Sequence, residues 1–288
     1  MEVISGRRAW QDMMASWSRS GSRVGLCPTM GAIHAGHLSL VRHSQAQCDR
    51  TVVSIFVNPT QFTLARDLET YPRPLKEDLA LLQTAGVDAV FVPEVHEIYP
   101  AYPEVSDVVL SVGRLGESFE GRDRPGHFSA VATVVSILLN LTQADSDFLG
   151  EKDFQQLCVV KAVIRDLGMA TQVVAVPTIR ESDGLAMSSR NGRLSGEGRR
   201  EALVIARALG DAQACARSGG HALSVRSAMH ERLASCTAFS LSYAELVDIN
   251  TFSPVPPETT KGTYRAVIAG VIEGVRLLDN AAVSFPSS

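Results

Sequence analysis

The chain has 288 residues, of which 45% are hydrophobic and 20% charged, and its formal net charge is −4 at pH 7. These values are typical of a soluble globular protein of one or two domains, and the lack of a basic excess argues against nucleic acid as a partner. No window approaches the roughly 18 consecutive apolar residues of a membrane span, and the start of the chain lacks a signal-peptide pattern. Because the five cysteines also form no close pair, we expect a cytoplasmic protein with reduced thiols and no membrane partner.

The first two-thirds of the chain alternates helix-like and strand-like segments. In chain order, the patterns predict a helix over 8–19, a strand over 24–27, a helix from Leu38, a strand over 51–57, a helix over 74–85, a strand over 87–92, a helix over 127–141, a strand end over 147–150, a helix over 154–167 and a strand over 172–176. Strands that alternate with helices form right-handed βαβ units. The predicted fold class is therefore α/β, with a Rossmann-like doubly wound parallel sheet.

After about Thr178 the pattern changes. Two helices are predicted over 197–217 and 222–235, followed by strands over 240–249 and 264–271 and a further segment over 275–280. We expect a smaller C-terminal α+β domain over residues 179–288, after a Rossmann-like domain over 1–178. The last residues, from Ser284 on, are expected to be frayed.

The stretch between the strand at 24–27 and the following helix contains two histidines three residues apart, His34 and His37. A helical first turn would place both on one face, and Gly31 and Gly36 let the backbone approach a ligand closely. A turn that ends at a helix N-terminus binds anions, because unpaired N–H groups and the helix dipole point there. A zinc half-site or two ordinary surface histidines are the alternatives. Zinc, however, needs three or four ligands, so phosphate binding is the better interpretation.

Two further segments carry groups that can bind phosphate. Lys152 is one of only four lysines among 27 basic residues, and it lies at a predicted helix start, where a cation is normally unfavourable unless an anion binds. The alternative is an exposed lysine paired with Glu151 or Asp153. The segment 187–190 offers two hydroxyls and a guanidinium, although its composition also fits a plain linker.

Polar side chains also follow the strand at 51–57. Asn58 and Gln61 place two amides at a strand end, where the ligand crevice of an open α/β sheet lies; a plain turn is the alternative. The next segment, Thr63–Pro74, is polar and is a candidate mobile lid. His127, before the long apolar helix, is either a helix cap or a site residue.

Six segments together closely resemble the pantothenate synthetase (pantoate–β-alanine ligase) family, one of the nucleotidyltransferases that share a His-x-Gly-His signature. The segments are Pro28–His37, Phe56–Phe62, Tyr71–Arg73, Arg124–Phe128, Gly150–Gln156 and Met187–Arg190, and the resemblance runs from Gly25 to about Asn280. One departure is Pro74, where the family pattern has a small polar residue. It affects the geometry of the candidate lid and not the chemistry.

The resemblance implies an ATP-dependent condensation of (R)-pantoate with β-alanine. Pantoate would attack the α-phosphorus of ATP to give pantoyl adenylate and pyrophosphate, and the β-alanine amine would then release AMP and pantothenate. It also implies a homodimer, and Mg²⁺ that bridges the ATP phosphates with few protein ligands, so that the protein holds no tightly bound metal. The first domain would bind the nucleotide and pantoate, and the second would contribute the Met187–Arg190 loop.

The resemblance also assigns residues to roles. Catalysis would fall to His34, His37, Lys152 and Arg190. ATP would be bound by Met30, Gly31, His34, His37, Gly150, Glu151, Lys152, Asp153, Ile179, Met187, Ser188, Ser189 and Arg190. Pantoate and β-alanine would be bound by Asn58, Gln61, Tyr71, Arg124 and Gln156.

Two other functions share parts of this pattern. One is an adenylyltransferase, which joins ATP to a phosphorylated acceptor and keeps the adenylyl group on its product. That activity would not call for the amides of Asn58 and Gln61. The other is a nucleotide-binding regulatory protein without turnover, against which the intact set of polar donors argues.

Overall fold

The computed structural model describes residues 1–63, 65–104 and 106–286. By its internal contacts the chain separates into two compact units, residues 1–151 with 159–177, and residues 152–158 with 178–288. The segment 152–158 thus packs with the second unit, although the first unit's chain flanks it on both sides. The division into domains over 1–178 and 179–288 stays a proposal.

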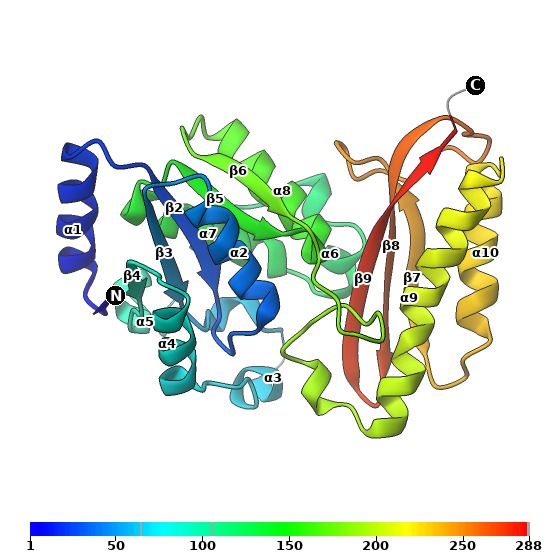
Figure 1. The fold of residues 1–288 in the computed structure, drawn as a ribbon, viewed down its shortest axis with the longest axis horizontal. Helices are drawn as coiled ribbons and strands as arrows, with labels where there is room; N and C mark the ends of the chain where they lie inside the picture. Colours follow the sequence, from blue (N-terminus) through cyan, green and yellow to red (C-terminus); the bar gives the residue numbers. More distant parts are fainter. Residues whose placement is uncertain (64, 105, 287–288) are drawn as a thin grey trace. The chain divides into compact units, whose positions relative to one another are not determined.

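The first unit is built on a six-stranded parallel sheet in the order β1-β4-β3-β2-β5-β6 (Figure 1). The strands are β1 (Glu2–Ile4), β2 (Val24–Thr29), β3 (Arg50–Ile55), β4 (Ala89–Phe91), β5 (Ser146–Gly150) and β6 (Gln172–Val176). The order reverses between β2 and β5, and in an open sheet the ligand crevice lies at the carboxyl ends of the strands at this switch point. The predicted α/β class with a doubly wound parallel sheet is confirmed.

Helices cover both faces of this sheet. They are α1 (Arg7–Arg19), α2 (Ala35–Gln45), α3 (Ala65–Glu69), α4 (Leu75–Thr84), α5 (Val95–Ile98), α6 (Glu120–Asp123), α7 (His127–Thr142) and α8 (Phe154–Asp166), whose residues 154–158 group with the second unit. Leu40 of α2 and Leu82 of α4 share one apolar cluster with Phe148 of β5. On α1, Trp10 stacks on Phe91 of β4 at 4.8 Å and donates to Thr142 of α7 at 3.2 Å. Phe148 of β5 and Phe91 of β4 are thus buried by different helices.

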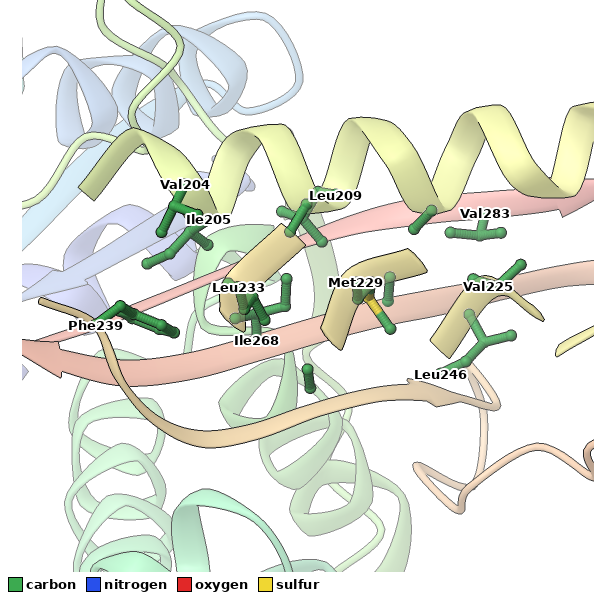
Figure 2. Close-up of a cluster of buried hydrophobic side chains, with 14 of the residues drawn as sticks. Val204, Ile205, Leu209, Val225, Met229, Leu233, Phe239, Leu246, Ile268 and Val283 are labelled. Carbon is green, nitrogen blue, oxygen red and sulfur yellow. The ribbon is translucent and has the colours of Figure 1, made fainter. Parts of the chain in front are cut away.

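The second unit contains a three-stranded antiparallel sheet in the order β7-β8-β9 and two long helices. Its elements are α9 (Gly196–Arg217), α10 (Ala222–Ala234), β7 (Ser240–Val247), β8 (Gly262–Ile272) and β9 (Val275–Phe285). Figure 2 shows its core, where Leu209 of α9 and Met229 and Leu233 of α10 pack over Ile268 of β8. This is the predicted smaller α+β unit.

The expectation that the chain is frayed from Ser284 on is wrong for Ser284 and Phe285. Ser284 and Phe285 pair with Thr263 and Gly262 in the β8–β9 ladder, and the Phe285 side chain is buried in the core of the second unit. The alternation of Val283 and Phe285 continues the strand, and its inward face has a core to fill. Residues 287–288 lie outside the described part of the chain.

The helices were also compared with the requirements of a membrane span. Among the described residues, no helix combines the length and the apolar composition that crossing a membrane requires.

Candidate active site

The turn from β2 to α2 is held by one buried carboxylate. Asp78 of α4 accepts the backbone N–H groups of Ala32 at 2.8 Å and Ile33 at 2.7 Å with its two oxygens. Gly31 and Ala32 both have positive φ, 81° and 51°, a conformation that costs a non-glycine residue free energy. Asp78 therefore stabilises a strained turn directly before His34. The sequence patterns did not single out Asp78, because an acidic residue in the first turn of a helix is usual at the surface.

The two histidines of the signature lie together at the start of α2. His34 is the N-cap, and its Nδ1 accepts from the Gly36 N–H at 3.1 Å, while Nδ1 of His37 accepts from the His34 N–H at 3.3 Å. The rings stack with centroids 4.1 Å apart. A Cβ on Gly36 would lie 2.8 Å from the His34 ring, so only glycine fits between the histidines. Because each Nδ1 accepts, a neutral ring of either histidine carries its proton on Nε2.

After β3, a chain of hydrogen bonds fixes the direction of the Gln61 amide. Asn58 is 1% exposed, and its Oδ1 accepts from the backbone N–H and the hydroxyl of Thr60 at 3.3 and 2.9 Å. Its Nδ2 must then donate, and it donates to Oε1 of Gln61 at 2.9 Å. The amide of Gln61 consequently has Oε1 turned to Asn58 and Nε2 on its other side. Burial raises the pKa of the nearby Tyr99 phenol, whose hydroxyl lies 3.4 Å from that of Thr60.

The backbone of Gln61 is held as well. Arg124 and His127 both donate to its carbonyl oxygen, at 3.2 and 3.1 Å. The Arg124 guanidinium also lies 3.2 Å from Nε2 of His127. Since an arginine can only donate, His127 accepts at Nε2 and donates from Nδ1. His127 is the first residue of α7, after the N-cap Gly126, and its ring holds the Gln61 backbone.

The remaining sequence candidates of the first unit lie at several places. Tyr71 is buried, with its ring edge-on to Phe62 at 5.6 Å. It follows α3, a short helix within the candidate lid Thr63–Pro74, of which Leu64 lies outside the described residues. Met30 is half-buried. Gly150 ends β5, and Glu151 follows it.

In the second unit, two segments carry the candidate phosphate donors. Lys152 precedes α8 and lies 3.5 Å from a carboxylate oxygen of Asp153. The Met187–Arg190 segment ends a tight hairpin, in which the Met187 N–H donates to the Ile179 carbonyl at 3.0 Å. The Ser188 hydroxyl accepts from the Arg190 N–H at 3.2 Å. The side chains of 187–190 and of Gln156 are half-buried, so ordered backbone holds partly accessible donors.

Among the described residues, no group of three or more His, Cys, Asp or Glu side chains is arranged to hold a metal ion.

The thiol of Cys27 in β2 lies close to the histidine turn in the sequence. The side chain is buried. Burial, and after it the negative charge of Asp147, raises the pKa of this thiol well above its usual value. A protonated, buried thiol is a poor nucleophile.

The sequence profile of the family described as pantoate-beta-alanine ligase matches residues 2–282. The chain belongs to this family. Among its relatives, the pantothenate synthetase of Cereibacter sphaeroides is 45% identical over 271 residues, covering 94% of this chain and 95% of the relative. That of Rubrobacter xylanophilus is 44% identical over 286 residues, 98% of each chain.

Solved structures agree with this membership. Pantothenate synthetase from Thermus thermophilus superposes with a TM-score of 0.92 at 42% identity, over 99% of this chain and 100% of that one. A pantoate-beta-alanine ligase from Francisella tularensis, complexed with Beta-gamma ATP and β-alanine, gives a TM-score of 0.79 at 30% identity, over 98% and 97% of the chains. The resemblance inferred from the six segments is confirmed, and the protein is a pantoate-beta-alanine ligase enzyme.

Proposed function

We propose that this ligase condenses (R)-pantoate with β-alanine in two steps, through a pantoyl adenylate. The observation that carries the proposal is the stacked histidine pair at the start of α2, whose two Nε2–H groups are the donors that a phosphate needs. The Francisella tularensis relative, complexed with Beta-gamma ATP and β-alanine, supports ATP and β-alanine as substrates.

In the first step, a carboxylate oxygen of pantoate attacks the α-phosphorus of ATP. The bond from that phosphorus to the oxygen of the β-phosphate breaks, and pyrophosphate leaves with the bonding electrons. His34, His37, Lys152 and Arg190 donate to the phosphate oxygens as charge moves onto the leaving group. Such preorganised donors lower a barrier without forming covalent bonds to the substrate.

Other residues complete the ATP set. Their roles are to offer hydroxyl or backbone donors to the phosphates and apolar surface to the adenine. They are Met30, Gly31, Gly150, Glu151, Asp153, Ile179, Met187, Ser188 and Ser189.

In the second step, the amine of β-alanine attacks the acyl carbon of the adenylate. The bond from that carbon to the phosphate oxygen breaks, AMP leaves, and the amine loses a proton as the amide forms. A closed lid over Thr63–Pro74 would keep water from hydrolysing the adenylate.

Pantoate is recognised through Gln61. Its Nε2 donates to an oxygen of pantoate, while Asn58 acts on the substrate through Gln61, because the Asn58 amide is already engaged at both ends. Gln156, Tyr71 and Arg124 complete the pantoate and β-alanine set.

Mg²⁺ would enter with ATP and be held mainly by the ATP phosphates, with few protein ligands. Activity should therefore require added Mg²⁺, whereas metal analysis of the purified protein should find no zinc. About one tightly bound zinc per chain, with activity lost on its removal, would overturn the phosphate role of His34 and His37. We further propose that the protein is a homodimer in the cytoplasm. Sedimentation velocity measures whether it forms a dimer.

The test of the reaction is the exchange of labelled pyrophosphate into ATP with pantoate alone, followed by product analysis with each substrate omitted in turn. We expect exchange without β-alanine, and AMP release only when all three substrates are present. Exchange that requires β-alanine would point to a concerted reaction. A product that keeps the adenylyl group would indicate an adenylyltransferase, and ATP binding without turnover a regulatory protein.

A further inference from the structure

Two consecutive residues of β9, Asp279 and Asn280, hold the two segments of the second unit that carry the candidate cations. Both side chains belong to the buried part of the unit, with exposed fractions of 5% and 4%. Neighbouring residues of a strand point to opposite faces, so one strand can reach two different segments. No sequence pattern singled them out, since the pair reads only as the polar end of an apolar run.

Asn280 fixes the backbone at Lys152. Its Nδ2 donates to the Lys152 carbonyl oxygen at 2.7 Å, and its Oδ1 accepts from Nε of Arg265 at 2.5 Å. A carbonyl can only accept and an arginine can only donate, so the amide has one possible orientation. The Arg265 guanidinium in turn lies over the ring of Phe154, 4.5 Å from its centroid, which fixes the chain again two residues after Lys152.

Asp279 fixes the hairpin that leads to Met187–Arg190. Its carboxylate accepts two hydrogen bonds from the Arg180 guanidinium, at 2.5 and 3.0 Å, a bidentate geometry that specifies orientation as well as strength. Arg180 also donates to the Gly184 carbonyl at 3.1 Å across the hairpin. Arg180 pairs with Ala186 in a β-bridge, so the carboxylate anchors the base of the hairpin.

We propose that Asp279 and Asn280 are positioning residues for the ligation, which set Lys152 and the Met187–Arg190 loop in fixed relation to each other. The inference rests on the proposed function, in which these cations act on the ATP phosphates. A displacement of about 1 Å in a reacting or stabilising group can cost on the order of 10²-fold in rate. Neither residue needs to contact a substrate to have this effect.

The selective variant is Asn280→Asp. The new carboxylate still accepts a hydrogen bond from Arg265, so the buried guanidinium stays paired. The substitution removes the N–H group that donates to the Lys152 carbonyl oxygen. We expect adenylate formation to slow by about 10- to 100-fold, mainly in kcat with little change in the KM for pantoate, while supplied pantoyl adenylate is converted at a rate within about threefold of the parent. The matched control is Ser284→Ala, which removes an exposed hydrogen bond to Thr263 in the same ladder and should leave both steps unchanged.

A double-mutant cycle tests whether Asn280 acts through Lys152. In a Lys152→Ala background the Asn280→Asp change should cost little more, because the group that it positions is gone. The same logic applies to Asp279→Asn in an Arg190→Ala background. Thermal unfolding of each variant shows whether the protein is folded at the assay temperature.

The outcomes separate this proposal from the proposed function. If Lys152→Ala slows adenylate formation but Asn280→Asp and Asp279→Asn do not, the positioning role is wrong and the function stands. Equal losses in both steps, or fully additive losses in the cycles, also contradict positioning and indicate a general structural role. If Lys152→Ala itself leaves adenylate formation unchanged, the phosphate role of that lysine fails first.

Discussion

The direction of one amide, that of Gln61, decides which ligand atoms it can bind. Asn58 occupies Oε1 of Gln61, so the side chain offers a donor and suits the carboxylate or hydroxyl oxygens of pantoate. Gln61→Glu should replace that donor with an acceptor, and Gln61→Ala should remove it, each weakening pantoate use. Losing a hydrogen bond to a buried polar ligand costs about 1–3 kcal/mol.

Steady-state KM and kcat for pantoate, beside equilibrium binding of ATP, measure this effect. ATP binding should stay within about twofold, a factor worth roughly 0.4 kcal/mol. The control is Gln45→Glu at the far end of α2, an exposed glutamine that donates to the carbonyls of Ala85 and Gly86. Equal losses for ATP and pantoate would refute the assignment of Gln61 to the small substrate.

His37 and Lys152 should matter in only one of the two steps. Both are assigned to the leaving pyrophosphate, so His37→Ala and Lys152→Ala should each slow adenylate formation by about 10²–10³-fold. The second step has no pyrophosphate to stabilise, so supplied adenylate should be consumed at close to the parent rate.

Single-turnover measurements of each half-reaction provide this test. His43→Ala, later on α2, and Lys161→Ala, exposed on α8, are matched controls that should leave both steps intact. If the first pair of variants lost both steps equally, the two residues would shape the whole site or serve β-alanine.

The sequence could indicate those candidate site residues whose amino-acid type is unusual for their position in a predicted element. Two histidines beside two glycines and a rare lysine at a helix start stand out in a single chain. Asp78, Asp279 and Asn280 do not, because their importance comes from long-range hydrogen bonds to backbone groups. Such contacts exist only once the chain has folded.

The β2–α2 turn depends on an element distant from it in the sequence, the helix α4. Asp78→Asn keeps the size of the side chain but replaces one of the two acceptors that bind the Ala32 and Ile33 N–H groups. An unpaired donor in a buried turn costs about 1–3 kcal/mol of stability. Since the turn also sets His34 at the helix N-cap, adenylate formation should fall by about 10-fold or more.

Urea unfolding and single-turnover kinetics together check this prediction. Asp12→Asn is the control, because that carboxylate is exposed and pairs with Arg8 along α1. A variant with normal stability and normal adenylate formation would show that the turn holds its shape without Asp78.

Long elements with a clear apolar period could be predicted from the sequence, and short ones could not. The strand β6 has the predicted bounds, and the other long elements differ by a few residues at their ends. The three-residue strand β1 was missed because Glu2 and Val3 are exposed at the sheet edge, which leaves no pattern. The short helix α3 formed within the candidate lid, where a polar composition indicated only a loop.

The stability of the whole molecule should depend on the ionisation of Asp147 in β5. This side chain is fully buried, neither of its oxygens has a hydrogen-bond partner within the described structure, and burial raises its pKa from 3.8 to about 7. Its folded-state pKa lies above the unfolded value, so the protonated form favours folding. That contribution is complete below about pH 4 and is lost as the pH rises through about 7.

Asp147→Asn should therefore remove part of the pH dependence of unfolding. Between pH 4 and 7 the parent should lose stability relative to the variant, by no more than roughly 4 kcal/mol. Free energies of unfolding in urea at successive pH values measure the difference. Parallel curves for the two proteins over this range would show that Asp147 does not titrate as its burial implies.

Because residues 152–158 belong to the second unit, the two units cannot be separated by dividing the chain at a single position. The chain passes between the units three times, after Glu151, Cys158 and Pro177. A fragment that ends at Pro177 would keep Phe154 without Arg265, which lies over its ring, and without Phe252, whose ring lies beside it. The second unit is consequently not a detachable module: neither one protease cut nor one recombination junction can exchange it between relatives with its packing intact.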